Sequence, residues 1–224
     1  NNDGTFNNGL MGLGSGSSIR FYGSSKLYNN GVFNNLNGLD GDNSHTSEIV
    51  NAGVLNSAEW GFIRNFGSVT NTGILNVADN MESNRFSNGA TGIVNNSQGW
   101  WGGNSGVVVY DFINQGIINN NIGAHFSAYA VSAINSGVIN NNGSFSSGDL
   151  ENTGVINNSE SINSNRVNNS GVINNDGVLY AQNLVSSGLV TGIGYFSTTT
   201  LVITEAGTLA PGNMLGHGMT IYGN

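Results

Sequence analysis

A glycine returns at the same point of one short phrase, Asn-x-Gly-apolar-apolar-Asn, along the whole of this 224-residue chain. Successive phrases lie 17 to 27 residues apart, with most intervals near 20. A repeat of this length is typical of solenoids, in which each unit must stack on its neighbours to bury its apolar side chains. The phrase glycines are Gly4, Gly31, Gly53, Gly73, Gly92, Gly116, Gly137, Gly154, Gly171, Gly188 and Gly207. The sequence therefore predicts a repetitive scaffold that leaves few residues for a catalytic site.

The most regular stretch, residues 154–188, shows what one repeat contains. Its period of 17 residues holds three apolar segments, at 155–157, 161–163 and 166–168, separated by Asn, Ser and Gly. Short Val- and Ile-rich segments bounded by turn-forming residues indicate β-strands, and no window has the periodicity of a helix. We expect a right-handed parallel β-helix of about 11 coils, each with three short strands, because parallel crossovers are right-handed in about 98% of cases.

A meander of hairpins is the alternative architecture, but it would shorten the period to about 8–12 residues. Stacked coils at about 4.8 Å per strand would instead give a rod roughly 50 Å long. We expect one domain over 1–224, with regular coils at about 26–190 and atypical ends at 1–25 and 191–224. Atypical terminal repeats are normal in solenoids.

Asparagine recurs on both sides of the glycine, and stacking would align each set into a ladder. An amide has two donors and an acceptor, so equivalent residues one coil apart can bond to each other and to turn backbone. Asn and Gly also tolerate left-handed backbone at a turn. The set two residues before the glycine is Asn2, Asn29, Asn51, Asn71, Asn114, Asn135, Asn152 and Asn169. The set three residues after it includes Asn34, Asn56, Asn76, Asn95, Asn119, Asn140, Asn157 and Asn174. Both sets are interpreted as architecture.

Composition excludes some partners. Only 8% of residues are charged and the net charge is −8, and a chain this polar and Gly-rich could be disordered. The apolar residues recur at regular intervals, however, which favours an ordered fold. The five basic residues are scattered, so neither nucleic acid nor an anionic membrane surface is expected as a partner. They are Arg20, Lys26, Arg64, Arg85 and Arg166.

The remaining bulk features bear on where the chain acts. No apolar run approaches the ~20 residues that a spanning helix needs, so we expect no membrane insertion by this segment. Cysteine is absent, which suits a chain that folds after export. The chain starts at Asn1 rather than Met, which suggests a processed precursor or an excised fragment.

The tail carries a family resemblance. Residues 207–213, Gly-Thr-Leu-Ala-Pro-Gly-Asn, lead into 214–224, Met-Leu-Gly-His-Gly-Met-Thr-Ile-Tyr-Gly-Asn. This tail and the Asn-x-Gly turns resemble the passenger region of bacterial autotransporters and related β-helical surface adhesins, although Met214 stands where that family usually has Ser. The resemblance implies a secreted or surface-displayed β-helix in an extracellular or cell-surface location, and it supplies no activity.

Parallel β-helices also include polysaccharide lyases and hydrolases, which need clustered acids as Ca²⁺ ligands or as an acid/base pair. The best cluster begins at Asp40 and Asp42. It departs from a calcium loop because His45 replaces the sixth-position Gly and Asn51 the twelfth-position Glu. A solvated loop is favoured over a metal site here, and we predict no catalytic residue and no cofactor.

Longer intervals between phrases indicate loops, which often carry binding in solenoids. The 24-residue interval contains the adjacent pair Trp100 and Trp101, with Tyr110 nearby. Neighbouring strand residues point to opposite sides, so at least one Trp lies outside the core. These three residues are the candidate binding positions, as an aromatic platform for a surface glycan or a host or cell-surface protein; a local cap over the coil edge is the alternative.

The leading functional hypothesis is a non-enzymatic, exported structural or adhesive β-helix that acts as a rigid rod. Head-to-tail self-association through open coil ends is a variant of it. A polysaccharide-active enzyme is the alternative. An ice-binding solenoid ranks third, because only Thr198–Thr200 resembles a Thr rank and no Thr ladder recurs.

Overall fold

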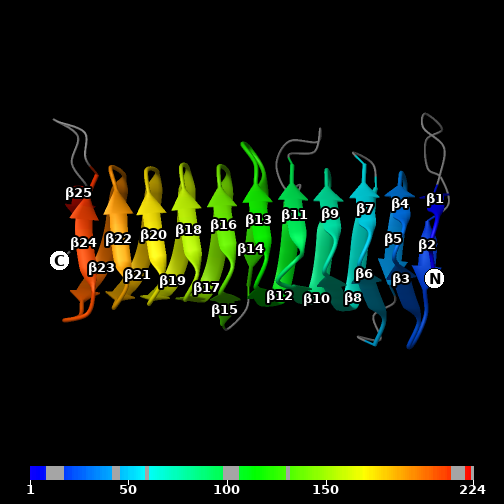
Figure 1. Ribbon diagram of the computed structural model, residues 1–224, viewed down its shortest axis with the longest axis horizontal. Helices are drawn as coiled ribbons and strands as arrows, with labels where there is room; N and C mark the ends of the chain where they lie inside the picture. The colour runs from blue at the N-terminus through cyan, green and yellow to red at the C-terminus, as the bar shows by residue number, and fades with distance from the viewer. Residues whose placement is uncertain are drawn as a thin grey trace.

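Two β-sheets make up the structure. They face each other across a shared core, and the strands of both sheets stack along one common axis. The computed structural model describes residues 1–8, 18–41, 46–58, 61–97, 106–129, 132–212 and 220–222. Throughout these ranges every regular element is a strand. The N-terminus lies at one end of the long axis and the C-terminus at the other (Figure 1). The predicted all-β parallel solenoid with Asn ladders is confirmed.

The first sheet consists of eleven short strands, one from each glycine phrase. Each begins directly after its phrase glycine and is four residues long. In spatial order they are β1 (Thr5–Asn8), β4 (Val32–Asn35), β7 (Val54–Ser57), β9 (Ile74–Val77), β11 (Ile93–Asn96), β13 (Ile117–Asn120), β16 (Val138–Asn141), β18 (Val155–Asn158), β20 (Val172–Asn175), β22 (Leu189–Gly192) and β24 (Thr208–Pro211). We call it the short-strand sheet.

The second sheet has fourteen strands, most of them longer, and we call it the long-strand sheet. Its main path is β2 (Ile19–Phe21), β5 (Gly38–Gly41), β8 (Phe62–Asn71), β10 (Met81–Asn88), β12 (Gly106–Asn114), β14 (His125–Ala128), β17 (Ser144–Asn152), β19 (Ser161–Asn169), β21 (Val178–Ser186), β23 (Tyr195–Ile203) and β25 (Thr220–Tyr222). Three short pieces complete it, namely β3 (Lys26–Asn29), β6 (Glu48–Asn51) and β15 (Ala133–Asn135).

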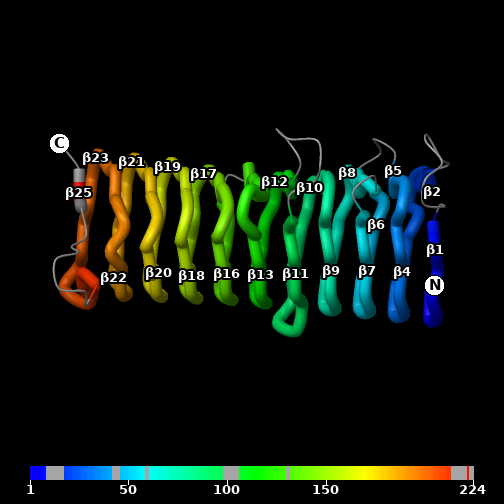
Figure 2. The backbone as a smooth tube through the Cα atoms, turned by 90° about the horizontal axis from the view of Figure 1, so that it is seen from above, coloured from blue at the N-terminus to red at the C-terminus, as the bar shows by residue number. Residues whose placement is uncertain are grey.

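Every strand pairs in parallel with the equivalent strand of the next turn. Val155, for example, aligns with Val138 on one side and Val172 on the other. The chain therefore advances by one strand per turn in each sheet, and the turns follow one another along the axis in chain order (Figure 2).

The number of turns is slightly lower than the eleven coils predicted. About nine turns are formed, although the short-strand sheet has eleven strands. A strand at either end of a solenoid adds to the sheet without belonging to a complete turn, which accounts for the difference.

Most turns also contain fewer strands than the three predicted. In the most regular turns the second and third apolar segments join into one strand of nine residues, such as β19. Burial in β19 alternates until Asn165 and Arg166, which are both exposed, and then resumes with Val167 buried. The strand thus bends at this point. Among the described turns, the second and third apolar segments form separate strands only as β2 and β3, β5 and β6, and β14 and β15.

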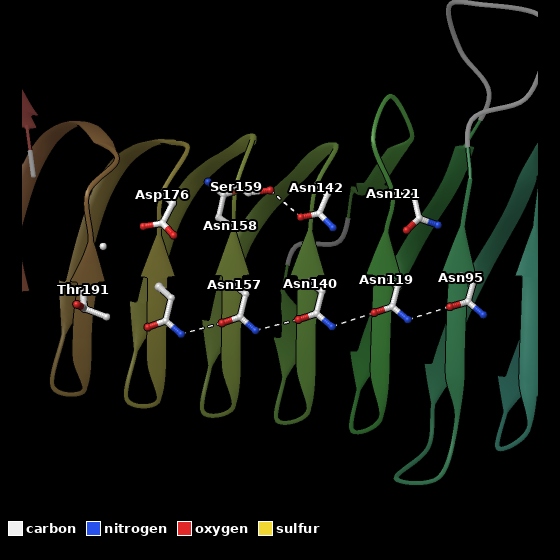
Figure 3. A pocket seen from close by; sticks show the side chains of 12 residues that line it. Asn95, Asn119, Asn121, Asn140, Asn142, Asn157, Asn158, Ser159, Asp176 and Thr191 are labelled. Atoms are coloured by element: carbon white, nitrogen blue, oxygen red, sulfur yellow. Dashed lines mark hydrogen bonds between the residues drawn. The ribbon is translucent and has the colours of Figure 1, made fainter. Parts of the chain in front are cut away.

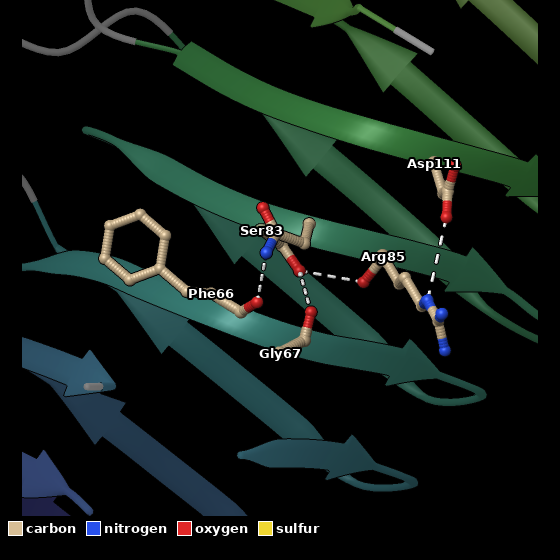
Figure 4. Close-up of polar contacts among 6 residues, drawn as sticks. Phe66, Gly67, Ser83, Arg85 and Asp111 are labelled. Carbon is tan, nitrogen blue, oxygen red and sulfur yellow. Dashed lines mark hydrogen bonds and ion pairs between the residues drawn. The ribbon is translucent and has the colours of Figure 1, made fainter. Parts of the chain in front are cut away.

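Buried hydroxyls satisfy the backbone at this bend. In β10 the Ser83 hydroxyl donates to the carbonyl of Arg85 at 2.8 Å and lies 3.5 Å from the carbonyl oxygen of Gly67 in the preceding turn (Figure 4). The pairing register shifts between Ser83 and Arg85. Ser164 repeats the arrangement with Arg166 and Gly148, at 2.8 and 2.7 Å. A bend inside the solenoid can therefore leave carbonyls out of the sheet without leaving them unpaired.

Three apolar columns fill the space between the sheets, one from the short strands and one from each half of the long strands. In the middle of the rod Phe112, Phe126 and Phe145 pack with centroids 5.3 to 6.2 Å apart. Ala133 stands beside Phe112 in register and is fully buried. A small residue next to large ones keeps the volume of the core constant from turn to turn.

The phrase glycines are required for close approach and not for left-handed backbone. Among the described residues, the glycines with positive φ are Gly23, Gly123 and Gly192, none of which belongs to a phrase. A Cβ on Gly154 would overlap the carbonyl oxygen of Gly137, and the same overlap recurs at most of the other phrase glycines. Tolerance of left-handed backbone therefore does not explain these glycines, because stacking at strand spacing brings each glycine against the backbone of the preceding turn.

Candidate functional site

The outer side of the short-strand sheet carries three parallel rows of side chains. Alternate residues of a strand point outward, so the rows come from positions one, three and five after the phrase glycine. The first, the aliphatic row, is Val32, Val54, Ile74, Ile93, Ile117, Val138, Val155, Val172 and Leu189. The second, the outer Asn row, contains Asn34, Asn56, Asn76, Asn95, Asn119, Asn140, Asn157 and Asn174. The third, the turn row, is Ser97, Asn121, Asn142, Ser159 and Asp176.

The outer Asn row is the predicted structural ladder, and it is confirmed. Asn140 donates from Nδ2 to Oδ1 of Asn119 at 2.9 Å, and its own Oδ1 accepts from Asn157 at 2.8 Å. The same bond links all the row's members in turn, starting from Asn7. The donors all point toward the N-terminal end, so the amide dipoles align and strengthen one another.

This ladder uses only part of the amides' bonding capacity. Each amide nitrogen has two N–H groups and each amide oxygen two lone pairs. Within the described part of the chain, Asn119, Asn140 and Asn157 each donate one bond and accept one bond, both along the row. These side chains are half-buried. One donor and one acceptor per turn therefore remain available on the outside.

A groove runs along this row. It has a volume of about 700 Å³ and extends from Asn95 to Thr191, with the outer Asn row as its floor and the turn row beside it (Figure 3). Ser159 donates to Oδ1 of Asn142 at 2.6 Å, which links the turn row across neighbouring turns. Among the lining residues only Asp176 is ionisable. The groove is thus polar, nearly uncharged and repeated at the spacing of the strands.

Two further Asn ladders lie inside the molecule. The predicted ladder before the glycine is confirmed: from Asn29 onward its members are almost fully buried, and each amide donates to the next one and also to a backbone carbonyl. Asn88 belongs to it although it stands four residues before Gly92, because the phrase is longer there. The ladder ends when Asn169 donates to Ser186.

The second buried ladder was not predicted. It lies four residues after the phrase glycine and joins Asn96, Asn120, Asn141, Asn158 and Asn175 at 2.6 to 2.8 Å. A further bond joins Asn8 to Asn35. The recurring Asn-Asn pair could have revealed it, since adjacent strand residues face opposite sides. In each pair the first Asn belongs to the outer row and the second to the interior.

This ladder has a gap at Val77. Val77 is register partner to Ser57 on one side and Asn96 on the other. Ser57 Oγ and Asn96 Oδ1 are buried and have no hydrogen-bond partner among the described residues. The valine side chain cannot donate a hydrogen bond to Asn96 Oδ1 or accept one from Ser57 Oγ, which explains why both atoms are unpaired.

The basic residues lie away from this groove. All five basic residues are on the long-strand sheet, and every ion pair in the described ranges joins register partners one turn apart. Lys26 and Glu48 are 2.8 Å apart, and the hydrogen bond and charge of Glu48 raise the pKa of Lys26. Arg85 pairs with Asp111 at 3.6 Å (Figure 4).

One run of these charges borders a second groove. Arg20, Asp40, Arg64 and Glu82 occupy equivalent positions on β2, β5, β8 and β10, so their signs alternate along the axis. Arg64 lies 3.7 Å from both Asp40 and Glu82 and above the ring of Phe62, 5.3 Å from its centroid. Asp40, which the sequence offered only as a weak candidate for a metal ligand, is part of an ion-pair row.

The other sequence-predicted site residues have mixed outcomes. Asp42, Trp100 and Trp101 lie outside the described residues, and so do residues 213–219 of the tail motif. Tyr110 is on the outer side of β12, 46% exposed, with its ring 6.3 Å from that of Tyr129. In the ranges that the structure describes, no three His, Cys, Asp or Glu side chains gather as metal ligands would, and no helix is long and apolar enough to cross a bilayer.

Comparison with known proteins adds no family. Neither a protein-family model, nor a curated protein, nor a solved structure matches the chain.

Proposed function

We propose that the chain is a non-enzymatic structural or adhesive rod, exported and displayed at or released from a bacterial surface. Its described length is occupied by one stacked architecture, in which buried ladders and apolar columns continue from turn to turn. The observation that carries the proposal is the difference between the ladders: the buried ones use both amide hydrogens, whereas the outer Asn row keeps bonding capacity directed outward.

Adhesion follows from repetition on such a surface. Each turn offers the same weak contact, and contacts held in one rigid body engage together with a high effective concentration. The resemblance of the tail and turns to autotransporter passengers supports the bacterial surface as the location. Self-association of rods is a variant that uses the same stacking chemistry at the ends.

The adhesive role is tested with beads that carry the folded chain. We expect them to be retained under flow on cell monolayers, and beads carrying a chain unfolded by heat to be washed away. Equal retention of both would contradict adhesion by the folded surface.

Antibody labelling of intact source cells tests display at the surface. Sedimentation velocity over a wide concentration range tests self-association, since a strict monomer would exclude that variant.

A polysaccharide-active enzyme is the second candidate, because Asp40 and Glu82 face one groove on either side of Arg64. They stand two strands apart, or about 9.6 Å at the spacing of a sheet. Inverting glycosidases hold their two carboxyl groups about 6.5–9.5 Å apart. On this hypothesis Asp40→Asn and Glu82→Gln would each abolish the release of reducing ends from a polysaccharide. Absence of turnover by the unaltered chain on a broad glycan panel would exclude it.

A further inference from the structure

We propose that the groove over the outer Asn row is a binding site for a neutral, linear polysaccharide lying along the axis of the rod. The inference rests on the adhesive function proposed above and names the ligand class. It depends on three properties of the groove: its unused hydrogen-bonding groups, its lack of cations and its direction.

The unused groups match hydroxyls. Asn119, Asn140 and Asn157 each keep one N–H and one oxygen lone pair after bonding along the row. A sugar hydroxyl is both donor and acceptor, so one hydroxyl can bond to the free oxygen of one amide and the free N–H of the next. Carboxylate and ammonium ligands offer only one of these two roles, and half of the available groups would stay unused.

Charge favours a neutral chain. None of the five basic residues lies on the short-strand sheet, the groove has Asp176 at one end, and the net charge is −8. A polyanion such as a uronate polymer would meet no cation in the groove and a negative field around it. A neutral polysaccharide meets neither penalty.

Direction favours a polymer. The groove spans six consecutive short strands, β11 to β22, which extend about 24 Å along the axis at strand spacing. The aliphatic row borders the outer Asn row for the same length, with Ile117 38% exposed, and can contact the C–H faces of sugar rings. Because the same contact recurs at each turn, affinity should rise with the number of sugars bound.

The test measures binding of defined oligosaccharides to the full chain by titration calorimetry. The probes are cellohexaose, maltohexaose and mannohexaose, with the trisaccharides for length and hexagalacturonate for charge. We expect at least one neutral hexasaccharide to bind, its trisaccharide to bind at least about tenfold more weakly, and hexagalacturonate not to bind.

Variants locate the site. The double change Asn140→Val with Asn157→Val should weaken hexasaccharide binding at least about tenfold, because it removes bonding groups from the centre of the row. The matched control, Asn163→Val with Asn183→Val, places the same changes on the long-strand sheet and should leave binding unchanged. Far-UV circular dichroism and thermal midpoints confirm that both variants fold.

Three outcomes would overturn the proposal: no neutral hexasaccharide binds, hexagalacturonate binds as well as the neutral ligands, or the Asn140/Asn157 variant binds like its control. The two proposals can fail separately. If the groove binds no oligosaccharide but the rod is adhesive through a protein receptor, the beads will still be retained on cells. Conversely, oligosaccharide binding without bead retention would contradict the adhesive role alone.

Discussion

Asn140 and Asn141 are adjacent in the sequence and chemically identical, yet the structure gives them opposite surroundings. Asn140 lies in the half-buried outer row, where water can replace a lost partner. Asn141 is fully buried, accepts from Asn120 at 2.7 Å and donates to Asn158 and to the carbonyl of Ser161, at 2.7 and 2.8 Å. Burial therefore decides which hydrogen bonds stabilise the fold.

The first prediction compares these two residues. Asn141→Val should lower the free energy of unfolding by about 2–4 kcal/mol, because it leaves a buried donor and buried acceptors unpaired. Asn140→Val should change it by no more than about 0.5 kcal/mol, as is usual for surface substitutions. Urea denaturation of both variants measures the difference. Equal effects would mean that the buried ladder is no more important than the exposed one.

The second prediction concerns the gap at Val77. Val77→Asn should stabilise the protein by about 1 kcal/mol, because the gain from pairing two buried polar atoms exceeds the lost apolar burial. The thermal midpoint should rise accordingly. The gain should disappear in a chain that also carries Asn96→Val, since one of the restored bonds is then missing; a gain that survives this second change would point to another cause.

The third prediction concerns Asp79, which follows β9 and is partly buried. Burial raises the pKa of its carboxyl group. The folded state therefore holds this proton to higher pH than the unfolded chain does, and stability is lost as pH rises through the raised pKa. Asp79→Asn should raise the thermal midpoint at pH 7 and leave it unchanged at pH 3. An equal effect at both pH values would contradict an ionisation effect.

At the scale of the element, the repeat is held in register by three kinds of contact. The glycine phrase fixes the closest approach of two turns, the buried ladders fix which Asn meets which, and the ion pairs connect only register partners. The ion pairs are exposed to solvent, so each contributes little to the free energy of folding. Their contribution is to specificity, because a strand that slipped by one residue would place every side chain on the wrong side of the sheet.

The fourth prediction tests the glycine. Gly154→Ala should destabilise the protein by about 3 kcal/mol or more, because its Cβ would overlap the carbonyl oxygen of Gly137 and force the turns apart. Gly4→Ala is the matched control, since nothing lies within 4 Å of a Cβ at that position. Chemical denaturation compares the two. Similar losses would indicate that backbone freedom, and not close approach, selects glycine in the phrase.

At the scale of the whole molecule, stability should vary along the axis. Each turn contacts only its neighbours, so the fold resembles a one-dimensional chain of coupled units. Between Asn96 and Asn175 both buried ladders are unbroken, whereas the turns around Val77 contain unpaired polar atoms and the terminal turns have a neighbour on one side only.

The fifth prediction follows from this gradient. Backbone amides in β13 to β20 should exchange with deuterium most slowly, those in β7 to β11 faster, and those in the terminal strands fastest. Hydrogen-exchange mass spectrometry resolves these regions. Val77→Asn should slow exchange in β7 to β11 in particular. Uniform exchange along the rod would show that it unfolds as one unit.

The sequence alone determined the architecture. The glycine period, the absence of helical patterns and the spacing of Val, Ile and Asn predicted a single stacked β-solenoid, its outer Asn row and one of its buried ladders, because a repeated fold places equivalent residues above one another. The sequence could not show whether a turn contains three short strands or one short strand and one long, bent strand. The bend is visible only as two successive exposed residues, such as Asn165 and Arg166.

Only the tertiary structure decided which asparagines are buried, why the glycines are needed and where a ligand could lie. Those properties depend on what the neighbouring turn places against each residue. Asn140 and Asn141 have the same chemistry in the sequence, and their roles separate when one faces the groove and the other the core. The alignment of Asp40, Arg64 and Glu82 likewise arises from stacking across intervals of unequal length, which residue spacing does not reveal.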